Sequence, residues 1–356
     1  MNDDYPTPEA IMQLTRAYAG SKALVSAVEL GLFTALADGP LTGQVLRAKL
    51  GLQPRGATDW LDALVSLGIL DRDGDLYANT AATDLYLDRA KPTYVGGMVM
   101  GMAADTSHWD SLTAALRTGR PQIEDDDDYL GQYHDPALFT EFMQSMTGLS
   151  MGAARAIAEK FPWQRYRTVI DVGAAEGCVP VQLALRHPQL TGGGFDLPMV
   201  RPAFEDYVNA HGLADRLRFY PGDFFADPLP PADVLVMGHV LHNWSLEQKL
   251  ELLGKAYRAL PDGGALIVYE SLIDDDRRAN TFGLLLSVAM LLVTRGGFGY
   301  TGAQCLSWMS DVGFRDSYVQ PLVGPDSMIV GLKEHHPRRP MTRHASHRGD
   351  HRVAAP

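Results

Sequence analysis

The segment TVIDVGAAEG at residues 168–177 decides the fold. Its β-branched and apolar beginning is typical of a buried strand, and the spacing predicts a helix directly afterwards over residues 178–187. Gly173 and Gly177 let the backbone turn tightly between strand and helix and approach a ligand closely. The amide groups at the start of the helix can receive a negative group. By itself, the segment predicts a site for a nucleotide-like ligand at the carboxyl end of the strand.

The alternation of short strand and helix continues down to residue 270. Strands are expected at 193–197, 217–222, 233–238 and 265–270, and helices at 202–211 and 246–260. These repeats predict a parallel, doubly wound sheet. Two later segments, 314–319 and 328–333, flank Gly324-Pro325-Asp326 and predict an antiparallel hairpin that closes the sheet. The fold class is therefore α/β, with a Rossmann-like sheet.

The helix expected at 246–260 has a clear start and a clear face. Ser245 followed by Gln248 forms a capping box. One apolar stripe then predicts the buried side of the helix: Leu246, Leu250, Leu253, Tyr257 and Leu260.

The first hundred residues predict a different, mostly helical unit. Helices are expected at 10–36, 43–50 and 57–67, the last with Trp60, Leu61, Leu64 and Leu67 on one face. A small hairpin with its turn at Asp73-Gly74 follows, which completes the order of a winged helix.

A winged helix serves either DNA binding or dimerisation. Residues 57–70, where a recognition helix would lie, hold two Asp and no Lys or Arg, so DNA binding is not expected. The helices around Leu24 to Leu36 carry more apolar surface than a winged helix alone can hide, which predicts a homodimer through this unit.

Composition limits the partners and the cellular compartment that can be expected for this chain. The chain has 356 residues, 46% of them hydrophobic, and a net charge of −12, which disfavours nucleic acid as a partner. Two cysteines, Cys178 and Cys305, cannot form a disulfide framework and fit a reducing, cytoplasmic setting. The acidic N-terminus does not resemble a signal peptide. The longest apolar run, 282–293, is too short to span a bilayer, so no membrane partner is expected.

The middle of the chain is rich in methionine and aromatic residues. Residues 94–165 are expected to be mostly helical. Met stripes are commonly core, but their adaptability also suits the wall of a small-molecule pocket. Candidate pocket residues are Trp109, Phe139, Met143, Met146 and Met290. The acidic run 124–128 is expected to be a solvated loop rather than a metal site.

We therefore expect four parts along the chain. They are a winged-helix-like dimerisation domain at 1–100, a helical linker and pocket segment at 101–165, a catalytic domain at 166–334 and a tail at 335–356. The tail is rich in His and Arg and nearly devoid of apolar residues, so disorder is favoured over metal binding.

The strand ends narrow the choice of ligand. No P-loop motif is present. Asp196, in Phe195-Asp196-Leu197-Pro198, can hold both ribose hydroxyls, which leaves NAD or S-adenosylmethionine. The acidic loop GAAEG suits a cationic sulfonium better than a pyrophosphate. At the next strand end, Asp223 can accept the adenine amino group and Phe224 can pack against the base.

A candidate base follows the fourth strand. His242 lies just beyond the strand's carboxyl end, where it can take a proton from a hydroxyl near neutral pH. Glu270 ends the fifth strand at the same edge and can orient the imidazole. The competing interpretation of a lone His is a structural one.

Six motifs in this order resemble a known family, the S-adenosylmethionine-dependent small-molecule O-methyltransferases of plant caffeate and flavonoid metabolism and of bacterial antibiotic tailoring. They are D-V-G-x-x-x-G, F-D-L-P, G-D-F-F, L-H-x-W, P-D-G-G (261–264) and G-G-x-x-x-T (296–301). The resemblance runs from about residue 15 to 334. It implies a winged-helix dimerisation domain before a Rossmann-like catalytic domain. It also implies cofactor contacts from Gly173, Asp196, Leu197, Asp223 and Phe224, with His242 as general base and Glu270 as its partner.

The chain departs from the family pattern at several positions. Ala174 and Ala175 replace two loop glycines, Asn243 replaces the Asp after the catalytic His, and a flanking Glu falls at Gly299. A cofactor-contacting Lys falls at Gly238. We expect a methyltransferase that acts on a hydroxyl of a small aromatic or polyketide-like metabolite, without a metal. The alternatives are a C-methyltransferase and a non-methylating, hydroxylase-like member of the same scaffold.

Overall fold

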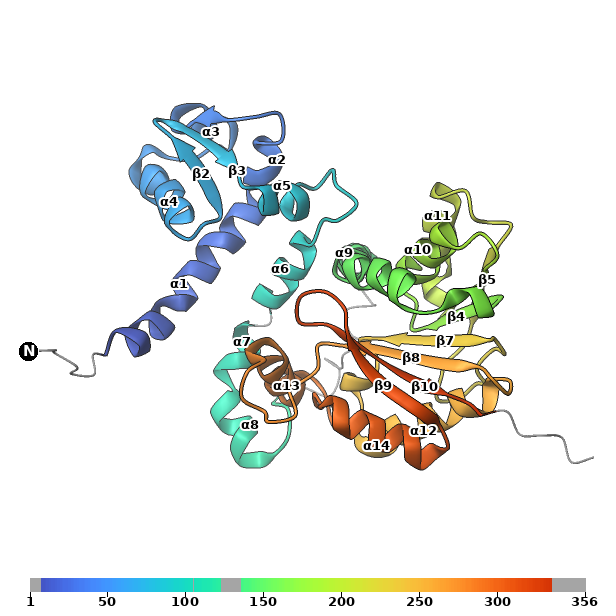
Figure 1. Ribbon diagram of the computed structural model, residues 1–356. Helices are drawn as coiled ribbons and strands as arrows, with labels where there is room; N and C mark the ends of the chain where they lie inside the picture. Colours follow the sequence, from blue (N-terminus) through green and yellow to red (C-terminus); the bar gives the residue numbers. More distant parts are fainter. Residues whose placement is uncertain (1–7, 105, 123–135, 335–356) are drawn as a thin grey trace, which may run out of the picture.

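The computed structural model describes residues 8–104, 106–122 and 136–334. Its centre is a seven-stranded sheet in the order β6-β5-β4-β7-β8-β10-β9 (Figure 1). The strands are β4 (Thr168–Val172), β5 (Thr191–Asp196), β6 (Leu217–Pro221), β7 (Val234–Gly238), β8 (Ala265–Glu270), β9 (Arg315–Pro321) and β10 (Ser327–Leu332). Strands β4 to β8 are parallel. The predicted doubly wound sheet is confirmed.

The closing hairpin lies at one edge of the sheet in an unusual order. Strand β10 pairs antiparallel with both β8 and β9, so the last of the described strands lies inside the sheet and β9 forms the edge. Ser327 at the start of β10 is opposite Glu270 at the end of β8. The turn between β9 and β10 therefore lies at the same edge of the sheet as the candidate base.

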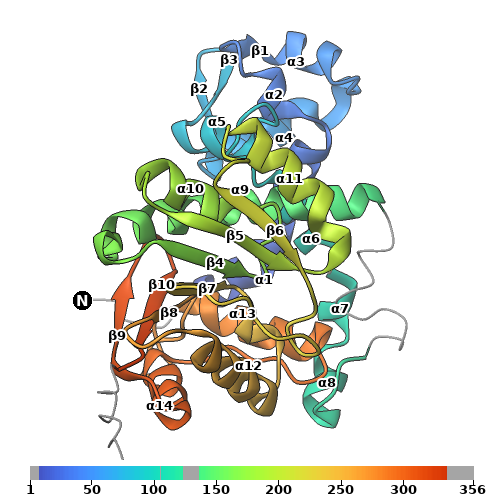
Figure 2. The same ribbon diagram turned by 90° about the vertical axis from the view of Figure 1, so that its right-hand side faces the viewer.

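Helices cover both faces of the sheet (Figures 1 and 2). One face packs against α9 (Pro136–Lys160), α10 (Cys178–Arg186) and α11 (Arg201–Ala210). The other packs against α12 (Leu246–Ala259) and α14 (Gly302–Val312). Helix α14 was not expected from the sequence, although a capping box of Thr301 and Gln304 marks its start.

The predicted buried stripe of α12 is wrong in part. Leu253 and Leu260 are buried as expected, but Leu246 is 43% exposed and Lys249 is completely buried. The Lys249 ammonium donates to the Trp244 carbonyl at 2.5 Å and lies 3.4 Å from the centre of the Phe298 ring. Burial lowers the pKa of Lys249 to about 8, against the opposing charge of Glu270. These contacts let the core accept a cation that the apolar pattern assigns to solvent.

The N-terminal unit has the predicted winged-helix order with one break. The elements are α1 (Glu9–Glu29), α2 (Leu32–Ala35), β1 (Leu41–Thr42), α3 (Gly43–Lys49), α4 (Pro54–Ser66), β2 (Leu70–Asp73), β3 (Leu76–Asn79) and α5 (Ala81–Leu87). The helix expected at 10–36 is two helices because Gly31 adopts a left-handed φ of 71°. Leu61 and Leu64 are buried, whereas Leu67 is 51% exposed and faces Gly20 of α1 instead of the core.

Three short helices follow the N-terminal unit along the chain: α6 (Gly96–Ala104), α7 (Thr106–Asp110) and α8 (Leu112–Thr118). Helix α13 (Thr281–Val293) comes later, after β8. Helix α13 contacts α7, α8 and the 3-10 turn η4 (Leu241–Asn243) that carries His242. Within the described residues, no helix is long and apolar enough to cross a membrane. The acidic run 124–128 and the tail 335–356 lie outside the described residues.

Candidate active site

The loop between β4 and α10 forms one side of the site. Gly173 has a φ of 79°, and a Cβ there would lie 2.8 Å from Val240. Ala175 also adopts a positive φ, of 47°, and its N–H donates to Asp196 Oδ2 at 2.9 Å. The other oxygen of Asp196 accepts from the Leu197 amide at 2.7 Å. The Asp196 carboxylate therefore holds the loop and its own strand end together, at the position expected for a ribose.

A cavity lies beside this loop, between α9, α10 and the ends of β7 and β8. It is lined by Met146, Thr147, Ser150, Asp171, Gly173, Ala174, Ala175, Cys178, Val179, Gly238 and Tyr269. Burial raises the pKa of Asp171 well above its usual range, and the nearby charge of Asp196 raises it further. Glu176 accepts a hydrogen bond from Thr147 at 2.6 Å. A ligand that carries positive charge would offset this cost of ionising the carboxyl groups.

Gly238 and Tyr269 share one space in this cavity. A Cβ on Gly238 would lie 2.0 Å from the Tyr269 ring, so no side chain fits at residue 238 while the ring holds its position. The Lys that the family pattern expects is therefore replaced by an aromatic ring from the neighbouring strand. Burial raises the pKa of Tyr269 well above its usual range, so the phenol stays neutral.

The predicted adenine contacts follow β6. Asp223 is exposed, and its carboxylate accepts from the Phe225 amide at 2.8 Å. The Phe224 ring is half-buried and meets the Trp244 ring edge to face, with centroids 5.7 Å apart. Both side chains follow the same strand end, and their contact with an adenine stays a prediction.

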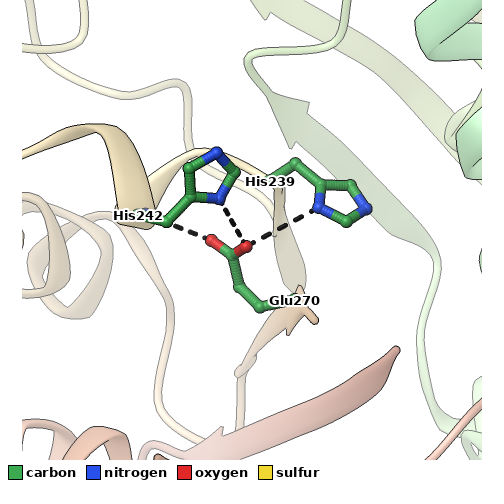
Figure 3. Close-up of side chains that lie close together, drawn as sticks. All are labelled: His239, His242 and Glu270. Carbon is green, nitrogen blue, oxygen red and sulfur yellow. Dashed lines mark hydrogen bonds and ion pairs between the residues drawn. The ribbon is translucent and has the colours of Figure 1, made fainter. Parts of the chain in front are cut away.

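His242 and Glu270 come together as the order of the strands predicts. Figure 3 shows the His242 ring beside the Glu270 carboxylate, with Nδ1 2.7 Å from Oε2. The His242 amide also donates to Oε1 at 3.3 Å. A carboxylate accepts hydrogen bonds only, so the proton of the neutral ring lies on Nδ1 and Nε2 keeps a free lone pair. The His242 side chain is 12% exposed, and Nε2 points away from Glu270.

The same carboxylate faces a second histidine, His239, which sequence reasoning missed. His239 Nδ1 lies 3.6 Å from Glu270 Oε2, and Nε2 lies 3.6 Å from Asp326 Oδ2. Burial alone would lower the pKa of His239, but Asp326 and Glu270 outweigh it and raise the pKa to about 10. Burial likewise opposes ionisation of Glu270, yet His242 and His239 hold the pKa of Glu270 below its usual range. Asp326 comes from the β9–β10 turn, so no local motif connects these residues.

The two departures near His242 have structural explanations. The buried Asn243 amide donates to the His239 carbonyl at 3.2 Å, a bond that a carboxylate could not donate. A Cβ on Gly299 would lie 2.9 Å from Ser287 of α13, so the space of the expected Glu is filled. Of the carboxylates that the family pattern places around the base, Glu270 alone contacts His242 among the described residues.

His239, His242 and Glu270 also have the composition of a metal site. Their nearest ligand atoms lie within 4.8 Å of one another. The 2.7 Å separation of His242 Nδ1 and Glu270 Oε2 is a hydrogen-bond distance, shorter than the spacing of two ligands around a tetrahedral zinc. We therefore interpret the group as a hydrogen-bonded histidine–carboxylate cluster.

The candidate pocket side chains do not form one cluster. Met146 lines the cavity beside the β4–α10 loop. Met143 is buried in an apolar cluster with Ala174, and Phe139 packs against that cluster. Met290 is buried in α13, while Trp109 of the neighbouring α7 is 37% exposed. Their role as a pocket wall stays a prediction.

The Rossmann-like sheet and the glycine turn with its neighbouring cavity define an S-adenosylmethionine-dependent methyltransferase. Asp196 and His242 lie at the positions that the sequence predicts for ribose binding and for the base. The glycine turn and the cavity around Ala174 and Ala175 leave the close backbone approach that this cofactor requires. Comparison with known proteins gives the family. The O-methyltransferase domain matches residues 109–315, and the O-methyltransferase dimerisation domain matches residues 12–89. The chain belongs to the O-methyltransferase family.

Three proteins that are similar to this chain in sequence or structure are named as methyltransferases. The tetracenomycin polyketide synthesis 8-O-methyltransferase TcmO of Streptomyces glaucescens is 44% identical over 92% of this chain and 97% of its own. The N,N-dimethyltransferase OxyT of Streptomyces rimosus is 40% identical over 74% and 78%. The structure of human N-acetylserotonin methyltransferase with S-adenosylmethionine has a TM-score of 0.84 at 27% identity, over 94% of this chain and all of that one.

Proposed function

We propose that this enzyme methylates a hydroxyl group of a small aromatic or polyketide-like metabolite, with His242 as the general base. The observation that carries the proposal is the 2.7 Å contact between His242 Nδ1 and Glu270, because it leaves Nε2 as the proton acceptor. The names of similar proteins support the acceptor class, since TcmO acts in polyketide synthesis.

The residues of the chain divide the work between binding and proton transfer. Gly173, Asp196 and Leu197 would hold the ribose side of S-adenosylmethionine, and Asp223 with Phe224 would hold the adenine. Gly238 would border the cofactor through the cavity that it lines. When bound, the cofactor supplies a methyl group on a cationic sulfur that keeps the electron pair of the broken C–S bond.

The base acts on the acceptor. His242 Nε2 takes the proton of the hydroxyl as its oxygen forms the bond to the methyl carbon. Glu270 fixes the ring tautomer and stabilises the imidazolium that results. Helices α7 and α13 beside η4 would exclude water and hold the acceptor in line, which supplies the proximity part of the rate enhancement.

We also propose a cytoplasmic homodimer formed through the N-terminal unit. The dimerisation-domain match and the exposed apolar residues Ile11, Leu14 and Tyr18 of α1 support the assembly. Two buried free thiols, Cys178 and Cys305, support a reducing compartment. Light scattering at micromolar concentration should give twice the chain mass, and a monomer would contradict the assembly.

A panel screen tests the function. Purified enzyme with methyl-labelled S-adenosylmethionine should transfer label to hydroxylated naphthoates or polycyclic polyketides. The panel should include amines and carbon nucleophiles, because one similar protein is named as an N,N-dimethyltransferase. Label that goes to nitrogen or carbon alone, or to no acceptor while the cofactor is bound, would contradict the proposal.

A further inference from the structure

A buried row of side chains continues behind the candidate base. His242 contacts Glu270, Glu270 faces His239, and His239 faces Asp326, whose other oxygen accepts a hydrogen bond from Ser271. His239 is 5% exposed and Asp326 7%. The row joins η4, β8 and the β9–β10 turn, and no step of the proposed reaction uses its far end.

We propose that His239 is a positioning residue, a buried cation held between Glu270 and Asp326 that shares the Glu270 carboxylate and thereby keeps His242 in the neutral form that accepts a proton. This inference rests on the proposed function, because it concerns the protonation state of the same base.

The argument begins with what a lone carboxylate would do. A buried Glu beside a histidine favours the charged ring, since the two charges attract strongly where water is excluded. A histidine that is already protonated cannot serve as a base. A second cation on the same oxygen reduces that attraction, because His239 and His242 both face Glu270 Oε2. The raised pKa of His239 agrees with this assignment.

Every charged or titratable neighbour of the row is consistent with a shared carboxylate. His239 faces Glu270 and the neutral Tyr269 of β8, Asp326 of the turn and His242 of η4. Glu270 is also within electrostatic range of three buried groups on the α12 and α14 side: Lys249, Tyr300 and Cys305. His239 and Lys249 are the cations in this set, and His239 alone lies between two carboxylates.

The backbone around His239 is arranged to hold it there. His239 adopts a φ of 53°, which is unusual for a residue with a side chain. Its N–H donates to the Tyr269 carbonyl at 3.1 Å, and its carbonyl accepts from Asn243. The Tyr269 ring, which fits because residue 238 is glycine, meets the His239 ring edge to face at 5.1 Å. Gly238 and Asn243, which depart from the family pattern, thus both help to hold His239 in position.

The decisive experiment measures the titration of His242 directly. The full-length enzyme is labelled with ¹³C-histidine and saturated with S-adenosylhomocysteine, and the His242 signal is assigned by its loss in His242→Gln. In His239→Gln the titration midpoint should move up by about one pH unit, the low end of the effect of one nearby charge, because the cation that shares Glu270 Oε2 is removed. Ser271→Ala leaves all charges in place and is the control, with less than half that shift expected.

The pH profile of turnover supplies the functional counterpart. With an acceptor from the panel, the acid limb of kcat/KM in His239→Gln should move to higher pH by the same amount. Activity at pH 9 should return to within threefold of wild type, which a merely structural defect would not allow. An unchanged or lowered midpoint in His239→Gln would overturn the inference, even if methyl transfer to oxygen is found. Shifted midpoints without such transfer would contradict the proposed function alone.

Discussion

The cofactor side and the base side of this site are formed by different kinds of groups, backbone on one side and charged side chains on the other. Around β4 and β5, backbone geometry defines the site, through the turn at Gly173 and two amides that donate to Asp196. Around η4, side-chain charges from separate strands and turns define it, with Glu270 at the centre. A site built from backbone leaves a local motif in the sequence, whereas one built from charges is visible only after folding. A substitution on the cofactor side should therefore weaken cofactor binding, and one on the base side should lower turnover.

The largest effect is expected at the base. His242→Ala should cut turnover roughly 10²–10⁴-fold, the usual range for a general base, because the ring nitrogen that accepts the proton is lost. Binding of S-adenosylhomocysteine, measured by calorimetry, should be unchanged. Glu270→Gln is the milder partner variant, since it keeps a hydrogen-bond acceptor. A His242→Ala enzyme within threefold of wild type from pH 6 to 9 would show that proximity alone drives the reaction.

Asp196→Asn probes the cofactor side in the same way. Loss of charge-assisted hydrogen bonds to the ribose and to the Ala175 and Leu197 amides should weaken cofactor binding by roughly 1–3 kcal/mol, about 5- to 150-fold. Turnover at saturating cofactor should stay within about threefold. Asp223→Asn, at an exposed carboxylate, is the matched control with a smaller loss. A fall in turnover as deep as that of His242→Ala would break the proposed separation.

Gly238→Ala tests the boundary where the two sides meet. Its Cβ would overlap the Tyr269 ring, so unfolding free energy should fall by about 1–3 kcal/mol, as for an overpacked core. Chemical denaturation measures the loss, and the double variant Gly238→Ala/Tyr269→Val should be no less stable than Tyr269→Val alone, because the overlapping ring is gone. If the single variant is as stable as wild type, the ring moves aside and does not define the cavity.

The last prediction concerns pH and stability on the base side. His239 has a raised pKa in the folded state, so its contribution to stability is complete below pH 6.5 and is lost as pH rises through about 10. The slope cannot exceed about 1.4 kcal/mol per pH unit for one proton. The melting temperature should therefore fall between pH 7 and 10, and fall less in His239→Gln. Parallel curves for the two proteins would contradict a charged His239.

The same contrast explains what the sequence predicts. The parallel sheet follows from repeated strand–helix patterns, and the His242–Glu270 contact follows because β7 and β8 are neighbours. The position of Asp196 beside the loop follows from the end of the next strand. Each of these depends on order along the chain, which periodicity records.

Most of the features that were missed depend on contacts that only the folded chain makes. Lys249 counts as polar in any apolar pattern, and only the folded contacts with Trp244 and Phe298 show how its charge is satisfied. Asp326 lies in a turn whose composition indicates chain reversal and nothing about charge. Helix α14 did leave a local signal, the capping box at Thr301, which would have found it.

The place of β10 has a consequence for how this enzyme matures on the ribosome. Its six residues pair with β8 along the full length of that strand, yet among the described strands they are the last to be synthesised. Until β10 pairs with β8, β8 is an open edge that can pair with another chain, and the turn that carries Asp326 is not fixed beside His239. Pairing of β10 therefore completes the sheet and also places the Asp326 carboxylate beside His239. A chain without β10 would therefore expose a sheet edge and leave His239 without its second carboxylate in place.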